Sequence, residues 1–471
     1  MSDPPNAALE GVRTALVLGL GKLTGAAVTD ALLSGGIEVR IHESFPNEGH
    51  RPAADAATER GAQVIYGETD PAAIEALVDW ADLVVPSPGV PPSSPALSAA
   101  LSRGRRVVSE IELGFGYAQG PVLAITGTNG KTTTTTLLAH IFDHAGVPGV
   151  AAGNIGHPLV EAARKSPPGT ALISEVSSFQ LAFIDAFRPQ IAVALNVADD
   201  HYDWHSGYEG YLAAKARITE NQRDDDALVI RAEEPGCLAI AANSSAEILG
   251  FGTAPPDQVR AGLHLALGRG VGTIAGVEGE EVVLESSGIA TVLVKLSDIR
   301  LHGLHNVENV MAAGLAAVRF GIAPQLVGAA VEAFGSLPHR TELVRTKDGV
   351  RYVDDSKATN PHATLRALSG LDKVVLIAGG RAKGLDLSIL GGAARSLSGV
   401  VVMGEAAAEL KNVFAGLPMN EAADVEEAVG YAAAMAEPGC TVLLSPACSS
   451  LDQYSSYSER GKRFRTAVEA L

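Results

Sequence analysis

The turn at residues 126–133 combines glycines, a lysine and threonine hydroxyls in an order that suits the binding of phosphate groups. It reads TGTNGKTT and follows the apolar run 122–125. Glycines let backbone N–H groups point inward around a phosphate, and the N-terminus of the following helix adds partial positive charge. Lys131 would reach the terminal phosphates of ATP, and the hydroxyl of Thr132 would hold Mg²⁺. The expected ATP contacts are Gly127, Thr128, Asn129, Gly130, Lys131, Thr132 and Thr133.

This turn departs from the generic phosphate-binding pattern at one position. The pattern GxxxxGK[ST] has glycine where this chain has Ile125, and the glycines of the turn are Gly127 and Gly130 instead. A glycine turn with an incidental lysine is the alternative interpretation. Because the order of strand, glycine turn and helix is the context that the motif requires, ATP binding is our first prediction.

Three further polar clusters follow apolar, strand-like runs. Residues 153–156 read GNIG, residues 174–181 read SEVSSFQL, and residues 196–205 read NVADDHYDWH. By itself the first cluster is typical of a hairpin turn or a helix cap. A carboxylate at a strand tip, such as Glu175, can bind Mg²⁺ opposite the threonine of a phosphate turn. The third cluster, with His201, indicates either a second metal site or a solvated loop with helix-capping aspartates.

Two helices after these clusters carry polar residues whose role the sequence leaves open. Lys215 lies in the helix expected at about 208–220, and a lysine on a helix is usually solvated. The segment 301–309 reads LHGLHNVEN and opens an apolar helix that runs to Phe320. There the simplest interpretation makes Asn306 the N-cap.

The last third of the chain repeats the arrangement of strand and polar loop. The apolar runs 350–353, 374–378 and 441–444 are followed by the loops DDSKATNP, GGRAKG and SPACSSLDQY. Acids, lysines and hydroxyls at strand ends indicate ligand binding more than simple turns. The segment 336–340, reading SLPHR, is typical of a hinge followed by a positive charge.

The first 120 residues predict a strand at 14–18, a glycine turn, a helix and a second strand that closes with Glu43. The turn reads GLGKLTG, which spaces its glycines one residue wider than the dinucleotide fingerprint. We therefore favour a Rossmann-like sheet that holds another nucleotide over one that binds NAD. The loop at 86–92, reading PSPGVPP, is either a ligand contact at a strand end or a proline-stiffened turn.

Together these elements predict an α/β chain of three domains. Residues 1–120 form an N-terminal Rossmann-like domain, and residues 121–336 form a central domain like the P-loop ATPases, with a mixed sheet. Glycine turns within 271–301 predict a small antiparallel portion of that sheet. Residues 337–471 form a second Rossmann-like domain.

Composition restricts the possible partners and the compartment. The chain has 471 residues and a formal net charge of −18, which argues against nucleic acid or an anionic membrane surface as a partner. Cys237, Cys440 and Cys448 have no zinc-binding spacing and read as reduced thiols. The N-terminus lacks the pattern of a signal peptide, and no apolar run is long enough to span a bilayer. We expect a cytoplasmic monomer.

The motifs TGTNGKTTT, GNIG, EVSSFQL, NVADDHYDWH and YLAAKARI occur in an order and spacing that resemble the Mur ligase family. The resemblance implies ATP-dependent amide formation in the synthesis of peptidoglycan precursors. SSFQL, DSKATNP and LLSPACSSLDQY are similar to the branch that adds D-glutamate to UDP-N-acetylmuramoyl-L-alanine. The DNPR-type motif of members that add a diamino acid is not found in the sequence.

The resemblance also implies roles for individual residues. Catalysis would rest on Lys131, His201 and Lys215, and the last corresponds to a lysine that CO₂ carbamylates. Two Mg²⁺ ions would be held by Thr132, Glu175, His201 and Lys215. Further ATP contacts would be Asn306, Asn309, Arg340 and Asp355. The UDP substrate would meet Leu23, Thr24, Gly25, Ser87, Pro88, Gly89, Asn154 and Ser177. D-glutamate would meet Thr359, Lys383, Ser450, Leu451 and Tyr457.

The implied reaction proceeds through an acyl phosphate, because a carboxylate must be activated before an amine can displace its oxygen. Two other classes remain open at this point. One is a sister ligase for a different amino acid, including folylpolyglutamate synthase. The other is a nucleotide-dependent switch or binding module that forms no amide.

Overall fold

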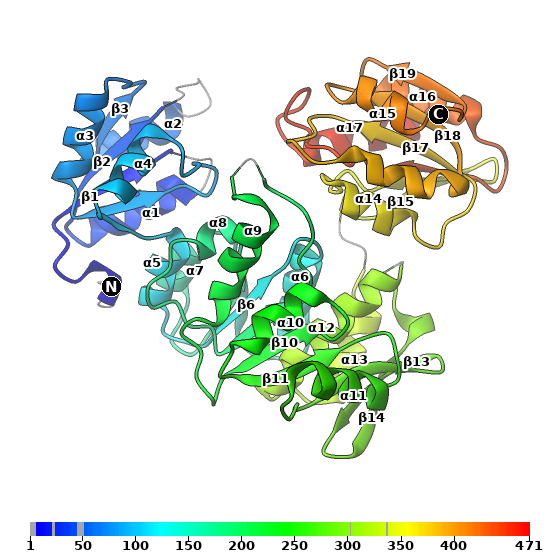
Figure 1. The fold of residues 1–471 in the computed structure, drawn as a ribbon, viewed down its shortest axis with the longest axis horizontal. Helices are drawn as coiled ribbons and strands as arrows, with labels where there is room; N and C mark the ends of the chain where they lie inside the picture. Colours follow the sequence, from blue (N-terminus) through cyan, green and yellow to red (C-terminus); the bar gives the residue numbers. More distant parts are fainter. Residues whose placement is uncertain (1–5, 21–23, 45–50, 203, 302, 336–337) are drawn as a thin grey trace. The chain divides into compact units, whose positions relative to one another are not determined.

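The computed structural model describes residues 6–20, 24–44, 51–202, 204–301, 303–335 and 338–471 (Figure 1). Contacts between residues group the chain into two compact units. The first consists of Met1–Val197, Glu209–Leu296 and Glu308–Glu332, and the second of Ala198–Tyr208, Ser297–Val307 and Ala333–Leu471. The predicted boundaries near residues 120 and 336 stay predictions.

The first sheet of unit 1 is parallel and has the strand order β3-β2-β1-β4-β5. Its strands are β1 Thr14–Leu18, β2 Glu38–Glu43, β3 Gln63–Tyr66, β4 Leu83–Pro86 and β5 Arg106–Val107. Its helices are α1 Thr24–Ser34, α2 Arg51–Glu59, α3 Pro71–Trp80 and α4 Pro95–Ser102. The strand order turns around at β1, so the crevice beside its carboxyl end is where such sheets bind ligands. The Rossmann-like prediction is confirmed.

The second sheet of unit 1 has nine strands in the order β14-β13-β12-β11-β10-β9-β6-β8-β7. The parallel strands are β6 Val122–Thr126, β7 Gly149–Gly153, β8 Ala171–Glu175, β9 Ile191–Ala194, β10 Ala227–Arg231, β11 Glu247–Phe251 and β12 Ile274–Glu278. Antiparallel β13 Glu281–Ser286 and β14 Ile289–Lys295 extend it, as predicted. The helices are α6 Lys131–His144, α7 Leu159–Lys165, α8 Ser178–Leu181, α9 Gly207–Ala216, α10 Pro235–Ala242, α11 Pro256–Leu267, α12 Leu304–Phe320 and α13 Pro324–Ala333.

The sheet of unit 2 has the order β15-β16-β20-β17-β18-β19. Its strands are β15 Glu342–Lys347, β16 Val350–Asp354, β17 Val374–Gly379, β18 Leu397–Met403, β19 Met419–Ala422 and β20 Thr441–Leu444. Its helices are α14 Pro361–Leu368, α15 Ala407–Val413, α16 Val425–Met435 and α17 Tyr457–Ala470. Only the pairing of β15 with β16 is antiparallel among the strand pairs described for this sheet.

Alternate residues of β17 explain why this strand reads as a continuous apolar run. Val374, Leu376 and Ala378 belong to the hydrophobic core on one side of the sheet. Val375 and Ile377 belong to the core on the other side. A parallel strand covered on both faces needs apolar side chains at every position, which is the pattern that identified the strand in the sequence.

Helix α5 (Glu110–Tyr117) follows the first sheet and carries two acidic side chains that are almost completely buried. Glu112 accepts hydrogen bonds from the backbone N–H groups of Asp185, Ala186 and Phe187, each at 2.9 Å. Glu110 accepts one from the N–H of Val160 at 2.7 Å, at the start of α7. These carboxylates satisfy backbone donors of α7 and of the loop at 185–187, and so fix α5 against both.

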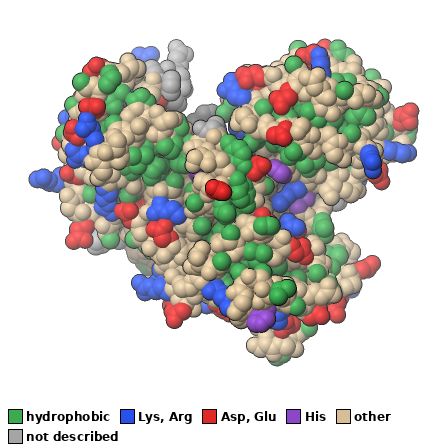
Figure 2. Space-filling model, in the orientation of Figure 1, with side chains coloured by type: hydrophobic (Ala, Val, Ile, Leu, Met, Phe, Trp, Pro, Cys, Tyr) green, Lys and Arg blue, Asp and Glu red, His purple; other side chains and the backbone are tan. Residues whose placement is uncertain are grey.

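The face of the molecule visible in Figure 2 carries apolar side chains as well as charges of both signs. On the visible face, acidic and basic side chains are interspersed over each unit (Figure 2). No helix in the described ranges is long and apolar enough to cross a membrane.

Candidate active site

The predicted phosphate-binding turn lies between β6 and α6, and its glycines adopt backbone angles that other residues avoid. Gly127 has φ 151° and Gly130, the N-cap of α6, has φ 89°. A Cβ atom at Gly130 would lie 2.5 Å from Oδ1 of Asn309 and 3.1 Å from a methyl group of Leu195. Both the backbone angle and the close approach of α12 therefore require glycine at position 130.

Lys131 folds back over this turn. Its Nζ donates hydrogen bonds to the backbone carbonyls of Gly127, at 2.6 Å, and Thr128, at 3.0 Å. The ammonium group therefore lies above the N-terminus of α6, where backbone N–H groups favour anions. A phosphate bound in the turn would meet this charge.

Thr132, in the first turn of α6, contacts Glu175, the last residue of β8. The hydroxyl of Thr132 donates to Oε2 of Glu175 at 2.7 Å, and Nδ2 of Asn154 donates to Oε1 at 3.0 Å. Ile125 of β6 pairs with Glu175 of β8 in parallel register, which places Glu175 beside the turn that follows β6. A hydroxyl oxygen and a carboxylate oxygen beside a phosphate turn form a donor set that fits Mg²⁺. The residue types present are therefore compatible with a bound magnesium ion.

Lys215 is buried, with 1% of its surface exposed, so the solvated alternative is wrong for this helix position. Its Nζ donates to the carbonyl of Gly127 at 2.9 Å and lies 4.4 Å from the ring centroid of Tyr211. The hydroxyl of Tyr211 lies 3.2 Å from the hydroxyl oxygen of Thr128. Tyr211 and Lys215 are one helical turn apart, and both pack α9 against the phosphate turn. Sequence analysis missed Tyr211, although this spacing could have shown it.

His201 lies in unit 2, so its predicted convergence with Glu175 and Lys215 of unit 1 stays a prediction. Its φ is 55°, and its Nε2 lies 3.6 Å from Oδ2 of Asp200. The same buried carboxylate accepts hydrogen bonds from Nδ2 of Asn360 at 3.2 Å and Nζ of Lys383 at 3.4 Å.

Asp200 is the second functional candidate that sequence analysis missed. The cluster NVADDHYDWH contains it, but nothing in the sequence brings its partners 160 and 183 residues away next to it. Its carboxylate links His201 to two of the polar loops of unit 2.

The loops that follow β16, β20 and β17 lie at one edge of the sheet in unit 2, because these strands are neighbours in that order. Thr359, Ser450, Leu451 and Lys383 lie on them, and Tyr457 begins α17. Ser450 is buried and Leu451 is exposed. The Nζ of Lys357 lies 3.8 Å from the ring centroid of Tyr457.

Asp355, the first residue after β16, is buried among hydrogen-bond donors. Its Oδ2 accepts from the hydroxyl of Ser445 at 2.8 Å, and its Oδ1 accepts from the N–H of Thr341 at 3.2 Å. Burial raises the pKa of this carboxyl group to about 7, although those bonds and the charge of Arg340 act in the opposite direction. Asp355 therefore changes its charge within the physiological pH range.

Three of the remaining candidate residues lie at or near the beginnings of α8 and α12. Oδ1 of Asn309 accepts from the hydroxyl of Thr134 at 3.3 Å. Ser177 caps α8, with Gln180 completing the capping box. Asn306 is buried within the first turn of α12, and the N-cap interpretation is wrong because this helix begins at Leu304.

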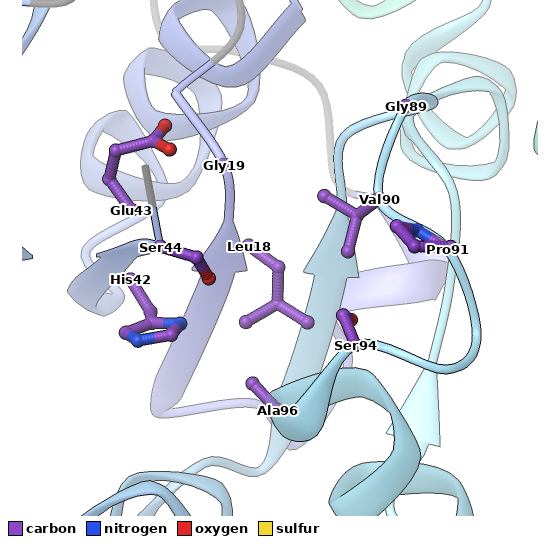
Figure 3. Close-up of a pocket in the computed structure, with 10 residues that line it drawn as sticks. All are labelled: Leu18, Gly19, His42, Glu43, Ser44, Gly89, Val90, Pro91, Ser94 and Ala96. Atoms are coloured by element: carbon purple, nitrogen blue, oxygen red, sulfur yellow. The ribbon is translucent and has the colours of Figure 1, made fainter. Parts of the chain in front are cut away.

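A pocket opens at the carboxyl end of β1 in the first sheet (Figure 3). His42 and Ser44 lie on one side of Leu18, and Val90 and Ser94 lie on the other. The pocket is lined by Leu18, Gly19, His42, Glu43, Ser44, Gly89, Val90, Pro91, Ser94 and Ala96. Of the predicted substrate contacts Gly89 lines this pocket, whereas Leu23 lies outside the described residues.

The glycine turn beside this pocket is held by hydrogen bonds and by a close backbone approach. Oε2 of Glu43 accepts from the N–H of Leu20 at 2.9 Å, and the hydroxyl of Ser87 donates to the carbonyl of Gly19 at 2.7 Å. A Cβ atom at Gly25 would lie 1.9 Å from the carbonyl oxygen of Leu20. Glu43, the last residue of β2, therefore orients the turn that would receive an anionic ligand. His42, whose Nε2 lies 3.1 Å from the carbonyl oxygen of Glu68, is a lining residue that sequence analysis missed.

Three family models match successive parts of the chain. Residues 13–109 match the Mur ligase MurD-like N-terminal domain, residues 125–317 match the Mur ligase middle domain, and residues 339–448 match the Mur ligase glutamate ligase domain.

Curated relatives match over nearly the whole chain. The UDP-N-acetylmuramoylalanine–D-glutamate ligase of Geobacter metallireducens is 39% identical over 97% of both chains. The protein of the same name from Geobacillus kaustophilus is 37% identical over 98% of both chains.

Solved structures share the fold at low sequence identity. The UDP-N-acetylmuramate-alanine ligase MurC of Thermotoga maritima has a TM-score of 0.57 and 16% identity, covering 98% of this chain and 99% of that one. The MurF ligase of Thermotoga maritima, solved in complex with ADP, has the same TM-score and identity, covering 92% and 95%.

Proposed function

The chain belongs to the Mur ligase family, and on that premise we propose that it joins D-glutamate to UDP-N-acetylmuramoyl-L-alanine at the expense of ATP. The full-length D-glutamate ligase relatives support this choice of substrates. The observation that carries the proposal is the group of polar side chains around one turn: Lys131, Lys215 and the Thr132–Glu175 pair. The product would be a precursor of peptidoglycan.

The proposed reaction first makes the substrate carboxylate a usable acyl donor. Its oxygen attacks the γ-phosphorus of ATP, which gives an acyl phosphate and ADP. The amine of D-glutamate then attacks the acyl carbon and forms a tetrahedral intermediate, which collapses to the amide and inorganic phosphate as a proton is lost. Lys131 would balance the charge that develops on the transferred phosphoryl group.

The proposed metal ligands are all oxygen or imidazole groups. Thr132 and Glu175 would hold one Mg²⁺, and His201 with carbamylated Lys215 would hold a second. Bound Mg²⁺ would neutralise charge on the phosphate oxygens of ATP. Asn154 would orient Glu175 through the hydrogen bond that the two side chains already make.

For ATP, we propose contacts from the turn Gly127–Thr133, from Asn306 and Asn309, and from Arg340 and Asp355 on phosphate and ribose. The incoming amino acid would be held by Thr359, Lys383, Ser450, Leu451 and Tyr457. The ammonium group of Lys383 suits a ligand with two carboxylates, and its bond to Asp200 would be exchanged for one to the ligand.

One assay tests the function against its alternatives. Phosphate release is measured with ATP, Mg²⁺ and UDP-N-acetylmuramoyl-L-alanine, together with D-glutamate, L-glutamate, L-lysine or no amino acid. We expect release to depend on D-glutamate. Highest release with another amino acid would indicate a sister ligase, and equal release in all four reactions would exclude amide formation and favour a nucleotide-dependent switch.

The pocket of the first sheet is proposed to hold the UDP part of the substrate, with Thr24, Gly25, Ser87, Pro88, Gly89, Asn154 and Ser177 as further contacts.

Glu43→Ala would remove the acceptor of the N–H of Leu20, and loss of such a buried hydrogen bond costs about 1–3 kcal/mol. We expect the KM for the UDP substrate to rise about tenfold, at about 1.4 kcal/mol per decade. Glu43→Gln keeps an acceptor oxygen and should stay within about twofold of the wild type. Equal KM values in both variants would contradict this role.

The raised pKa of Asp355 predicts that ATP binding depends on pH. Because its pKa is raised to about 7, the carboxyl group is mostly neutral at pH 6 and mostly ionised at pH 8. An ionised acceptor binds ribose hydroxyls more strongly, so the KM for ATP should fall about fivefold over this range. Asp355→Asn should remove the part of the pH profile that Asp355 causes and leave the titration of ATP itself.

Ionisation of Asp355 also changes the free energy of unfolding, and the raised pKa gives the direction of that change. A carboxyl group whose pKa is raised on folding stabilises the fold fully below its unfolded pKa, and this contribution is lost as the pH rises towards 7. The melting temperature of the wild type should therefore fall more than that of Asp355→Asn between pH 5 and pH 8. A larger fall in the variant would contradict the sign.

We also propose that the protein acts as a cytoplasmic monomer. Its three cysteines are buried free thiols, which supports a reducing compartment. Size-exclusion chromatography coupled to light scattering tests the monomer, for which 48.4 kDa is expected.

A further inference from the structure

Arg460, in the first turn of α17, is fully buried and contacts the backbone of three separate segments of the chain. Its Nε donates to the hydroxyl oxygen of Ser356 at 3.0 Å, and its Nη2 donates to the carbonyl of Ser356 at 2.9 Å. Nη2 also donates to the carbonyl of Cys448, and Nη1 to that of Gly379, both at 3.3 Å. One guanidinium group thus joins the last residue of β17 to the segments that follow β16 and β20.

The loops that follow these three strands, together with the start of α17, carry every residue proposed to contact the amino acid. Thr359 follows β16, Lys383 follows β17, Ser450 and Leu451 follow β20, and Tyr457 begins α17. The hydroxyl of Ser356 closes the network, because it accepts from Arg460 and donates to the carbonyl of Tyr457 at 2.8 Å. We propose that Arg460 is a positioning residue that fixes the spacing of the groups around the amino-acid substrate.

The backbone of these loops needs such support. Lys383 and Ala447 are not glycines, yet they have φ angles of 58° and 61°. Conformations of this kind cost energy and persist only when the surrounding structure holds them. Ala447 directly precedes Cys448, whose carbonyl Arg460 binds, so the guanidinium acts next to one of the two strained positions.

The shape of the side chain matters more than its charge. The acceptors are a hydroxyl and three carbonyl oxygens that point at one planar group from several directions. A guanidinium offers five N–H donors in a fixed fork, whereas a lysine ammonium offers three from one point. Burial lowers the pKa of Arg460 to about 10, so the group remains charged at neutral pH.

The inference rests on the proposed function, and kinetics of Arg460→Lys test it. The KM for D-glutamate should rise at least tenfold, while the KM for the UDP substrate stays within twofold. Arg463→Lys is the matched control, because Arg463 lies one turn away on α17 and pairs with half-buried Glu426 at 2.5 Å. This control should leave all three substrate KM values unchanged.

Ser356→Ala tests the same network without removing the buried charge. It deletes the link between Arg460 and Tyr457 and should raise the KM for D-glutamate at least threefold. The proposal is overturned if both variants keep the wild-type KM for D-glutamate, or if all KM values change equally and the melting temperature falls. A wild type whose phosphate release ignores D-glutamate would instead overturn the proposed function, and the inference with it.

Discussion

Lys131→Ala is expected to lower kcat about a thousandfold, the upper range for removing one group that stabilises transition-state charge. The Nζ of Lys131 lies over the phosphate turn, held by the carbonyls of Gly127 and Thr128. Alanine keeps the helix position but removes the cation that a transferring phosphoryl group would meet. Phosphate release at saturating ATP, UDP substrate and D-glutamate measures the loss.

Lys165→Ala is the matched control for this substitution. Lys165 ends α7, is largely exposed, and pairs with Glu161 at 2.5 Å one helical turn away. Surface changes of this kind are worth less than about 0.5 kcal/mol, so kcat and melting temperature should match the wild type. If Lys131→Ala keeps more than about a tenth of the wild-type kcat, Lys131 does not stabilise the transition state as proposed.

Most strands could be predicted from the sequence, because a run of apolar residues marks a buried strand within a few neighbouring positions. β6 and β17 are buried on both faces, and every residue of each run is apolar or small. β15 was missed because it is an edge strand whose residues are partly or largely exposed and include Glu342, Arg345 and Lys347. An edge strand of this kind has no apolar run to mark it.

The polar clusters were predicted at strand ends, but their partners were not. Glu175 and Thr132 could be placed together, because parallel strands deliver their carboxyl ends to one edge. Asp200 with Lys383, and Arg460 with Gly379, are separated by 183 and 81 residues, and only the folded chain brings them together. The hydrophobic periodicity of these segments does not predict such long-range contacts.

The environment of Lys215 is a second feature that was not predicted from the sequence alone. A lysine on a helix is usually solvated, and this expectation outweighed its one-turn spacing from Tyr211, which places the two side chains on one face of α9. Its proposed carbamylation was inferred from the family resemblance. Its position is given by the structure, in which it is buried against Gly127 and Tyr211. Whether it acts there as an ammonium or as a carbamate is a question of charge, and substitutions that change charge and volume separately can answer it.

Lys215→Ala is expected to abolish turnover, and small carboxylates are expected to restore part of it. A carbamate would present two oxygen ligands where the ammonium now meets the carbonyl of Gly127. Alanine removes those oxygens and leaves a buried space next to the turn, which formate or acetate can fill with the same kind of group. Phosphate release is measured with and without each added carboxylate.

Lys215→Arg separates the two chemistries. Arginine keeps a positive charge and a donor for Gly127 but is not expected to form a carbamate, and its larger head group leaves no space for formate. If the cation itself is needed, Lys215→Arg should retain activity and Lys215→Ala should not respond to carboxylates. If the carbamate is needed, Lys215→Arg should be inactive with or without formate, whereas Lys215→Ala should regain activity as the formate concentration rises. An Lys215→Ala variant that turns over at the wild-type rate in the absence of any added carboxylate would exclude both roles.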